Sequence, residues 1–225
     1  DVYKRQALEI TYNGGNINRP DEQVLDDTDR YGIEVALQLK EKFDAEVTVI
    51  SMGSLGTEKG IQQALQMGPD GALVLEDDSL SGSNSLMTAN VLSELSKKVE
   101  ADITIFGTES TDGYSGVIPQ QVSRMLGVPC ISYIKSVDID ESVTLTRQTS
   151  TGSEKVVMPS NCVLSVTAGG VEPRYPNFKD IMAAKSKPIE RISIGDISYD
   201  AQQNLEFVDI KAVSYTHLTL PTTPY

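Results

Sequence analysis

The sequence has few of the side chains that most often carry nucleophilic or metal chemistry. It contains one histidine, His217, and two cysteines, Cys130 and Cys162, which stand far apart and form no C-x-x-C pair. That spacing argues against a zinc site or a disulfide framework, and we expect buried free thiols. The chain also lacks a run of about 18 apolar residues, the pattern of a transmembrane helix. No signal-like start is visible, so the cytoplasm is the default compartment unless a targeting peptide precedes the sequence.

Both ends of the sequence look foreign to the protein. Residues 1–6 can be encoded by GATGTGTATAAGAGACAG, and the reverse complement of that string encodes residues 213–217 in another frame. Two natural termini have no reason to be reverse complements, and the string resembles a transposase adapter used in sequencing libraries. We therefore assign residues 1–6 and 213–225 to the adapter and take residues 7–212 as native. A natural Thr/Pro-rich tail at residues 218–225 is the alternative.

Without those ends the fragment has no histidine, because His217 lies in the second adapter run. This removes Ser/His or Cys/His nucleophilic catalysis and histidine metal sites from consideration. The full chain has 19 basic and 32 acidic residues, a net charge of -13. Such an acidic surface is poorly suited to nucleic acid or to an anionic membrane. About 200 native residues, with a hydrophobic content of 39% over the whole chain, are enough for one sizeable core or for one domain with an appendage.

Short apolar runs alternate with helical patterns over residues 29–135. This order predicts an α/β, Rossmann-like fold, a parallel sheet with helices on both faces. Buried strands are expected at residues 46–51, 71–75 and 103–106. Apolar residues at three-to-four spacing between them predict helices, and a fourth helix around residues 118–126 ends at Gly127 ahead of Pro129.

Beyond Pro129 the pattern becomes β-rich, without intervening helices. Strands are expected at residues 130–140, 143–149, 155–158 and 163–167, with a turn at 150–153. A helix at residues 178–185 and a short run at 191–194 follow. At the front, residues 8–17 predict a small hairpin. No strong strand precedes it, although a sheet of this kind normally begins with one.

The junction from Phe106 to Pro119 is the first candidate site. A glycine-rich turn before a helix offers backbone N–H groups and the positive end of a helix dipole to an anion. Gly113 and Gly116 permit close backbone approach, and Ser115 can donate a hydroxyl. The segment has neither a Walker lysine nor a G-x-G-x-x-G motif. It can therefore be read either as a nucleotide-binding loop or as an ordinary capped connection between a strand and a helix. Strand ends at residues 51–53 and 106–107 would share one carboxyl edge, where a single nucleotide fits.

Acidic residues cluster at two places. Asp26, Asp27 and Asp29 precede the first helix and are read as its N-terminal caps in preference to metal ligands. The run at residues 76–78 is read as a solvated strand end. We expect no metal site, and no pair of carboxylates is assigned to acid/base catalysis.

The second candidate site is the segment 170–185. Two prolines, Tyr175 and Phe178 precede an apolar helix start, which suggests a stiff and partly exposed loop that carries aromatic side chains. An ordinary crossover with buried aromatic rings is equally compatible with the pattern.

The segment Glu172-Pro-Arg-Tyr175, followed by Ile181-Met-Ala-Ala-Lys185, resembles the signature of the electron transfer flavoprotein β subunit. Three further segments resemble the family in the same order: Gly32-Ile-Glu-Val-Ala-Leu37, Ala64-Leu-Gln-Met-Gly68 and Gly107-Thr-Glu-Ser-Thr-Asp-Gly113. The resemblance covers roughly residues 25–197. It implies a nucleotide-binding domain over residues 7–197, of the adenine nucleotide alpha hydrolase-like type, and the start of a C-terminal arm at 198–212.

The family resemblance implies an αβ heterodimer without catalytic residues of its own in β. The α subunit holds most of the redox FAD, and β binds a second nucleotide, which is AMP in most members. Electrons are expected from acyl-CoA dehydrogenases or similar flavin dehydrogenases of fatty acid oxidation, with a quinone oxidoreductase-type acceptor. No nucleic acid and no direct membrane insertion are expected.

Site residues are carried over by position. The implied cofactor-binding residues are Met52, Gly107, Thr108, Asp112, Ser115, Gly116, Val117 and Ile118. A recognition loop that docks on partner dehydrogenases is implied over residues 172–185, with Phe178 at its apolar tip. Its implied partner-binding residues are Glu172, Pro173, Arg174, Tyr175, Phe178, Ile181 and Met182.

Three departures from the family pattern matter. Members typically open with a strand that ends in a Val-Lys-x-Val-Pro-like turn, which this sequence lacks, so one wall of the nucleotide site is expected to be absent. Electron-bifurcating members bind FAD in β, and their loop differs from residues 112–117 here, which favours AMP. Gln148 stands where some members carry a carboxylate. Besides the bifurcating alternative, a stand-alone protein resembling the universal stress proteins stays open, and the bound nucleotide would discriminate among the three.

Overall fold

The computed structural model describes residues 11–13, 16–18, 24–53, 58–111 and 113–199. The chain divides into two compact units. One comprises Asp1–Pro20 with Asn204–Tyr225, and its described residues form an antiparallel hairpin of β1 (Thr11–Asn13) and β2 (Asn16–Asn18). This confirms the hairpin expected at the front of the sequence, shifted by a few residues. The adapter-derived ends and the expected C-terminal arm lie outside the described residues.

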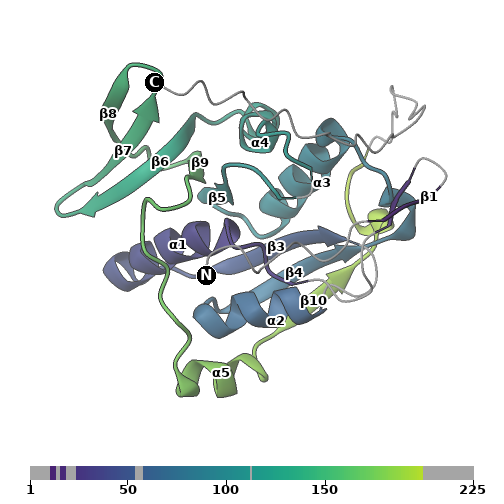
Figure 1. Cartoon of the computed structure of the whole chain (residues 1–225). Helices are drawn as coiled ribbons and strands as arrows, with labels where there is room; N and C mark the ends of the chain where they lie inside the picture. Colours follow the sequence, from purple (N-terminus) through teal and green to yellow (C-terminus); the bar gives the residue numbers. More distant parts are fainter. Residues whose placement is uncertain (1–10, 14–15, 19–23, 54–57, 112, 200–225) are drawn as a thin grey trace, which may run out of the picture. The chain divides into compact units, whose positions relative to one another are not determined.

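The second unit, Asp21–Gln203, is an α/β structure with two sheets (Figure 1). A parallel three-stranded sheet has the order β10-β4-β3, from β10 (Ile189–Ile192), β4 (Gly71–Glu76) and β3 (Thr48–Gly53). A five-stranded sheet has the order β5-β9-β6-β7-β8, from β5 (Ile103–Gly107), β9 (Cys162–Val166), β6 (Cys130–Ile139), β7 (Val143–Thr149) and β8 (Gly152–Val157). The α/β class predicted from the sequence is confirmed.

Helices connect the strands and cover both sheets. They are α1 (Asp29–Phe43), α2 (Glu58–Met67), α3 (Ser85–Lys98), α4 (Ile118–Leu126) and α5 (Phe178–Ala184), with short 3₁₀ turns at Asp78–Leu80 and Ile194–Asp196. Their ends follow local chemistry. Asn84 caps α3 by accepting a hydrogen bond from the Met87 N–H at 3.0 Å. Gly127, with φ of 71°, ends α4 as predicted.

Alternation along the strands explains the layers. In β9, Leu164 packs with Val35 of α1 on one face, whereas the adjacent Val163 packs with Val122 of α4 on the other. In β4, Val74 packs in the hydrophobic cluster under α2 and α5. The adjacent Leu73 and Leu75 pack in the cluster under α3, on the other face. The central strands β4 and β9 therefore bury both faces, which explains why each is a short continuous apolar run.

One expectation about organisation was incomplete. The strands beyond Pro129 were expected as a β-rich part without stated strand neighbours; β9 pairs in parallel with both β5 and β6, so this part continues the sheet that begins with β5. Strand β10 likewise joins β4 in parallel. Only β6, β7 and β8 form the antiparallel meander. Periodicity identifies these strands but cannot choose their neighbours, because pairing depends on contacts remote in sequence.

Two sheet edges stand out. Among the described residues, β3 pairs only with β4, and β5 pairs only with β9. Both strands are flanked by helices, and each presents one edge without a paired strand.

Candidate functional site

The first candidate site is the loop between β5 and α4, which begins at the carboxyl end of β5. Asp26, 85 residues earlier in the chain, holds this loop against the start of α1. Its Oδ2 accepts hydrogen bonds from the N–H and hydroxyl of Thr111 at 2.9 and 2.7 Å. Its Oδ1 accepts from the N–H and hydroxyl of Thr28 at 2.9 and 2.8 Å. Burial alone would raise the pKa of the Asp26 carboxyl, but these hydrogen bonds outweigh it and keep the pKa below the ordinary value.

The helix-cap interpretation is incomplete for Asp26. Its Oδ1 caps the turn before α1 by accepting from the Thr28 N–H, while its Oδ2 binds Thr111 of the loop. Thr28 occupies the N-cap position of α1 and makes no side-chain capping bond. Its hydroxyl instead lies 3.2 Å from the carbonyl oxygen of Glu109, in the loop. A side chain at Gly107 would stand 3.2 Å from polar atoms of Thr28 and Asp29, so this strand end packs directly against the helix start. Asp26 and Thr28 thus join two remote segments, which no local sequence pattern could reveal.

The loop itself has an uncommon backbone. Gly116 has φ of 62°, and Val117 follows with φ of -117° and ψ of -8°. In general, a left-handed residue followed by a right-handed one directs successive N–H groups to one side, which is the backbone geometry of a concave anion site. The first N–H groups of α4 adjoin it and have no partners within the helix. Tyr114 is also left-handed, with φ of 49°.

Gln120 supports the loop from within α4. Its side-chain amide lies between the Ser132 hydroxyl, at 3.0 Å, and the carbonyl oxygens of Gly116 and Val117. With its nitrogen turned to the loop, the amide donates to these carbonyls at 3.3 and 3.1 Å and accepts from Ser132. Sequence reasoning missed Gln120 and Ser132. An isolated polar residue early in a helix gives no signal of its own.

The structure brings together most of the expected cofactor residues. Gly107, Thr108, Ser115, Gly116, Val117 and Ile118 lie on this one connection between β5 and α4. The Thr108 hydroxyl lies 3.2 Å from the carbonyl oxygen of Val166, at the carboxyl end of the neighbouring β9. Met52 lies near the carboxyl end of β3, in the other sheet, and packs partly buried against Leu75 and its neighbours. Asp112 lies outside the described residues.

The second candidate site is the segment before α5. Its aromatic side chains are exposed: 91% of Tyr175 and 79% of Phe178 is accessible, and Met182 is half exposed. The alternative of a crossover with buried aromatic rings is therefore wrong. Ile181 is only partly exposed, and Ala184 at the end of α5 is fully buried against the three-stranded sheet. The helix begins at Phe178, where Asn177 caps it by accepting from the Asp180 N–H at 3.0 Å.

Arg174 faces the protein. Its guanidinium contacts Glu34 and Glu41, both on α1. The hydrogen bonds that Arg174 donates to Glu34 and then to Glu41 raise its pKa above the ordinary value. Burial would raise the pKa of Glu34, yet the bonds from Arg174 and Gln38 lower it overall. Of the expected partner-binding residues, Arg174 therefore makes its contacts within the chain, whereas Tyr175 and Phe178 point outward.

The interpretation of residues 76–78 as a solvated strand end also needs correction. Glu76 forms an ion pair with Arg191 of β10, and only 13% of its side chain is exposed. Asp77 caps the following 3₁₀ turn through Ser79 and also accepts from the Ile194 N–H at 3.3 Å. These carboxylates join neighbouring elements, because β10 returns beside β4 from more than a hundred residues away.

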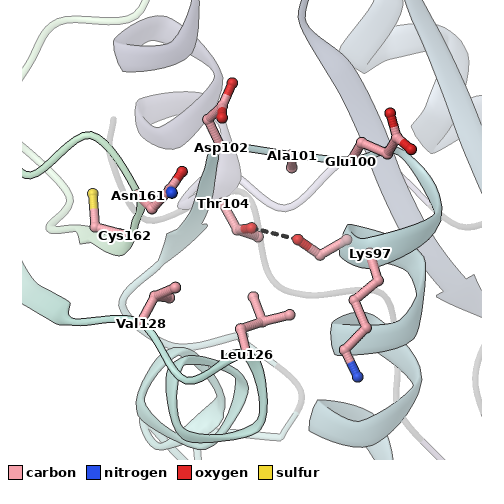
Figure 2. A pocket seen from close by; sticks show the side chains of 10 residues that line it. Lys97, Glu100, Ala101, Asp102, Thr104, Leu126, Val128, Asn161 and Cys162 are labelled. Carbon is pink, nitrogen blue, oxygen red and sulfur yellow. Dashed lines mark hydrogen bonds between the residues drawn. The ribbon is translucent and has the colours of Figure 1, made fainter.

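A cavity of about 210 Å³ lies at the amino ends of β5 and β9, the ends remote from the loop between β5 and α4 (Figure 2). It is bounded by the amino ends of β5 and β9 and by the C-terminal ends of α3 and α4. A hydrogen bond of 2.6 Å joins the hydroxyls of Ser96 and Thr104 beside it. Cys162 lines it, and burial first, then the nearby Cys130, raises the pKa of that thiol to about 11. Cys162 is buried as expected, whereas Cys130 is only half buried.

Comparison with known proteins extends these observations. The family described as "Electron transfer flavoprotein domain" matches residues 15–197. The electron transfer flavoprotein subunit beta of Mycobacterium tuberculosis strain H37Rv is 33% identical over 187 residues, which cover 80% of this chain and 70% of that protein. The chain belongs to the electron transfer flavoprotein β-subunit family. The electron transfer flavoprotein subunit beta of Bacillus subtilis strain 168 is 31% identical over 183 residues, which cover 80% of this chain and 71% of that protein.

The family match confirms the resemblance on which the site residues were assigned. Both candidate sites of this electron transfer flavoprotein subunit lie within the matched residues 15–197. In the part of the chain that the structure describes, no helix combines the length and the apolar character needed to cross a membrane.

Proposed function

We propose that this chain is the β subunit of a heterodimeric electron carrier. In this proposal it binds AMP in the loop between β5 and α4 and helps to hold the FAD of an α subunit. It supplies no catalytic residues of its own and works in the cytoplasm. The family membership supports the carrier role, and it displaces the alternative of a stand-alone universal-stress-like protein.

One observation carries the nucleotide assignment. Gly116 and Val117 form a left-handed then right-handed pair directly before the N-terminus of α4. This arrangement combines a concave set of backbone N–H groups with the positive end of a helix dipole, the two features that favour phosphate. The Asp26 bonds to Thr111 and the Gln120 amide hold the loop in that shape from both sides. The loop is therefore preorganised for an anion.

The nucleotide content of the full-length heterodimer tests this assignment. The protein would be purified, denatured and its small molecules separated and identified by mass spectrometry. We expect one AMP and one FAD per heterodimer. Two FAD per heterodimer, with flavin absorbance in isolated β, would instead support a bifurcating subunit. A heterodimer that releases FAD but no adenine nucleotide beyond it would refute the AMP site.

We propose that the exposed side chains before and on α5 dock on a flavin dehydrogenase, such as an acyl-CoA dehydrogenase. Tyr175, Phe178 and Met182 are large apolar groups with half or more of their surface accessible. Such side chains on an ordered segment act as anchors when they fill a pocket on a partner. A quinone oxidoreductase-type acceptor would receive the electrons afterwards. Stopped-flow flavin reduction by candidate dehydrogenases tests this role, and no reduction by any of them would contradict it.

We also propose that a further strand belongs between β3 and β5. Each presents an edge without a paired strand among the described residues, and each pairs in parallel with its one neighbour. The opening strand typical of the family would join them into one sheet and supply the missing wall of the nucleotide site. A full-length protein that carries this segment should protect the backbone amides of β3 and β5 from hydrogen exchange. Unprotected amides along these edges would argue against the proposal.

A further inference from the structure

Glu34 and Arg174 meet across 140 residues of sequence. Arg174 gives the Glu34 carboxylate three hydrogen bonds: from its backbone N–H at 3.1 Å, from Nε at 2.8 Å and from Nη2 at 3.0 Å. Gln38, one turn further along α1, adds a fourth at 3.0 Å. Glu34 is only 4% exposed. A buried carboxylate needs such partners, because an unpaired charge away from water is strongly unfavourable.

The backbone bond distinguishes this ion pair from an ordinary surface salt bridge. A side-chain contact alone restrains only the long, flexible side chain. The hydrogen bond from the Arg174 backbone N–H to Glu34 also fixes the main chain at that position. The planar guanidinium presents two parallel N–H groups to both oxygens of one carboxylate, a geometry that lysine cannot reproduce. Position and orientation of the segment are therefore both determined at Arg174.

The segment so fixed carries the exposed aromatic rings. Tyr175 directly follows Arg174, and prolines at 173 and 176 restrict the backbone on either side. Upstream, Gly170 lies so close to β6 that a side chain there would come within 2.4 Å of the Lys135 carbonyl oxygen. Downstream, the buried Ala184 anchors α5. Arg174 thus provides the middle attachment of a segment already held at both ends.

We propose that Glu34 and Arg174 form a clamp that positions the docking surface, so that Arg174 is a positioning residue and does not contact the partner. The proposal rests on the docking role proposed above. Glu41 also contacts Arg174, but it is exposed and replaceable by water. A released segment would sample several arrangements and bind in only a fraction of them. The apparent affinity falls by that fraction, so a segment competent one tenth of the time raises KM about tenfold.

The test uses the full-length heterodimer with Arg174→Gln, Glu34→Gln and Arg174→Lys, and with Glu41→Gln as the matched control. Two measurements are made: hydrogen exchange of residues 172–178, and KM and kcat for electron transfer from a flavin dehydrogenase. We expect the first two variants to speed exchange and raise KM about tenfold with little change in kcat, because the flavin is untouched. Glu41→Gln should behave like the wild type.

Arg174→Lys separates positioning from direct contact. If Arg174 offered its charge to the partner, lysine would restore the wild-type KM, and the proposal would be wrong. Unchanged exchange in Arg174→Gln would also overturn it. Should a single variant fail to fold because it leaves a buried charge, the double variant Glu34→Gln/Arg174→Gln removes both charges and keeps both readouts. Failure of the wild type to accept electrons would contradict the proposed docking role alone, since exchange still reports on the clamp.

Discussion

Gly116 is the residue on which the nucleotide assignment depends most. Its φ of 62° favours glycine, and a β-branched side chain at that position would force the loop away from its observed shape. We expect Gly116→Val to lose AMP, at a cost of about 1–3 kcal/mol if a hydrogen bond to a charged phosphate is broken. Nucleotide content after purification measures this.

Gly127→Val is the matched control for that prediction. Gly127 has φ of 71° and no atom within 4 Å of an added side chain, so the substitution imposes similar backbone strain at the other end of α4. The control should lower stability and keep AMP. Wild-type AMP occupancy in Gly116→Val, or equal loss in both variants, would count against the assignment.

The carboxyl of Asp26 predicts how the stability of the fold depends on pH. Hydrogen bonds from Thr111 and Thr28 outweigh burial and hold the pKa of Asp26 in the folded protein below the ordinary 3.8, so its contribution to stability is fully present above that pH. The contribution is lost as pH falls through the lower, folded pKa, because protonation weakens the bonds from Thr28 and Thr111. We expect acid unfolding below about pH 4 to be less steep in Asp26→Asn than in the wild type. Parallel acid titrations followed by circular dichroism would show this, and identical curves would contradict it.

The segment before α5 and α5 itself carry exposed side chains, so we expect substitutions there to change partner binding more than stability. Phe178 is 79% exposed, so its truncation removes little buried surface. We expect Phe178→Ala to change stability by less than about 0.5 kcal/mol. Docking on the dehydrogenase should weaken by roughly 2 kcal/mol if this ring is an anchor. Melting curves run beside a transfer assay measure both quantities.

Leu86→Ala serves as the control, since Leu86 is a half-exposed apolar residue at the start of α3. It should leave both melting temperature and transfer unchanged. A large drop in the melting temperature of Phe178→Ala, or an unaltered transfer rate, would show that the tip of the docking segment has been assigned to the wrong residue.

Local patterns predicted most of the elements, because helices and buried strands follow from spacing and burial. The strand at Val143–Thr149 and the helix end at Gly127 agree with the sequence-based expectation. The pairing of β9 with β5 did not follow, since no local signal specifies a partner strand. Nor could the bonds of Asp26 to Thr111 and of Arg174 to Glu34 be foreseen. They join carboxylates to donors that only the folded chain brings together.

For the whole molecule, the adapter hypothesis gives a direct test. Residues 213–217 match the adapter string, and residues 213–225 all lie beyond the family match, which ends at residue 197. Deleting residues 213–225 should therefore leave the melting temperature unchanged within about 1 °C, because surface changes away from packed features alter stability little. A clear loss of stability would favour a natural tail that packs on the protein.

The acidic balance of the whole chain bears on its partners. With a net charge of -13, association with another acidic surface would be slowed at low salt, and a basic surface would be attracted. The ionic-strength dependence of the rate of complex formation with a dehydrogenase would reveal which applies. The apolar anchors of the docking segment would then determine how long the complex lasts.

Helix α1 carries contacts to both candidate sites. Just before its start, Asp26 and Thr28 contact the loop between β5 and α4. About one turn into the helix, Glu34 accepts hydrogen bonds from Arg174, which precedes Tyr175. A single helix moves largely as a rigid rod, so a shift imposed at one end is felt at the other. If the nucleotide and the docking partner bind as proposed and each shifts α1, each changes the affinity of the protein for the other by the same factor. A nucleotide with no part in electron transfer would in this way tune the lifetime of the encounter on which electron transfer depends.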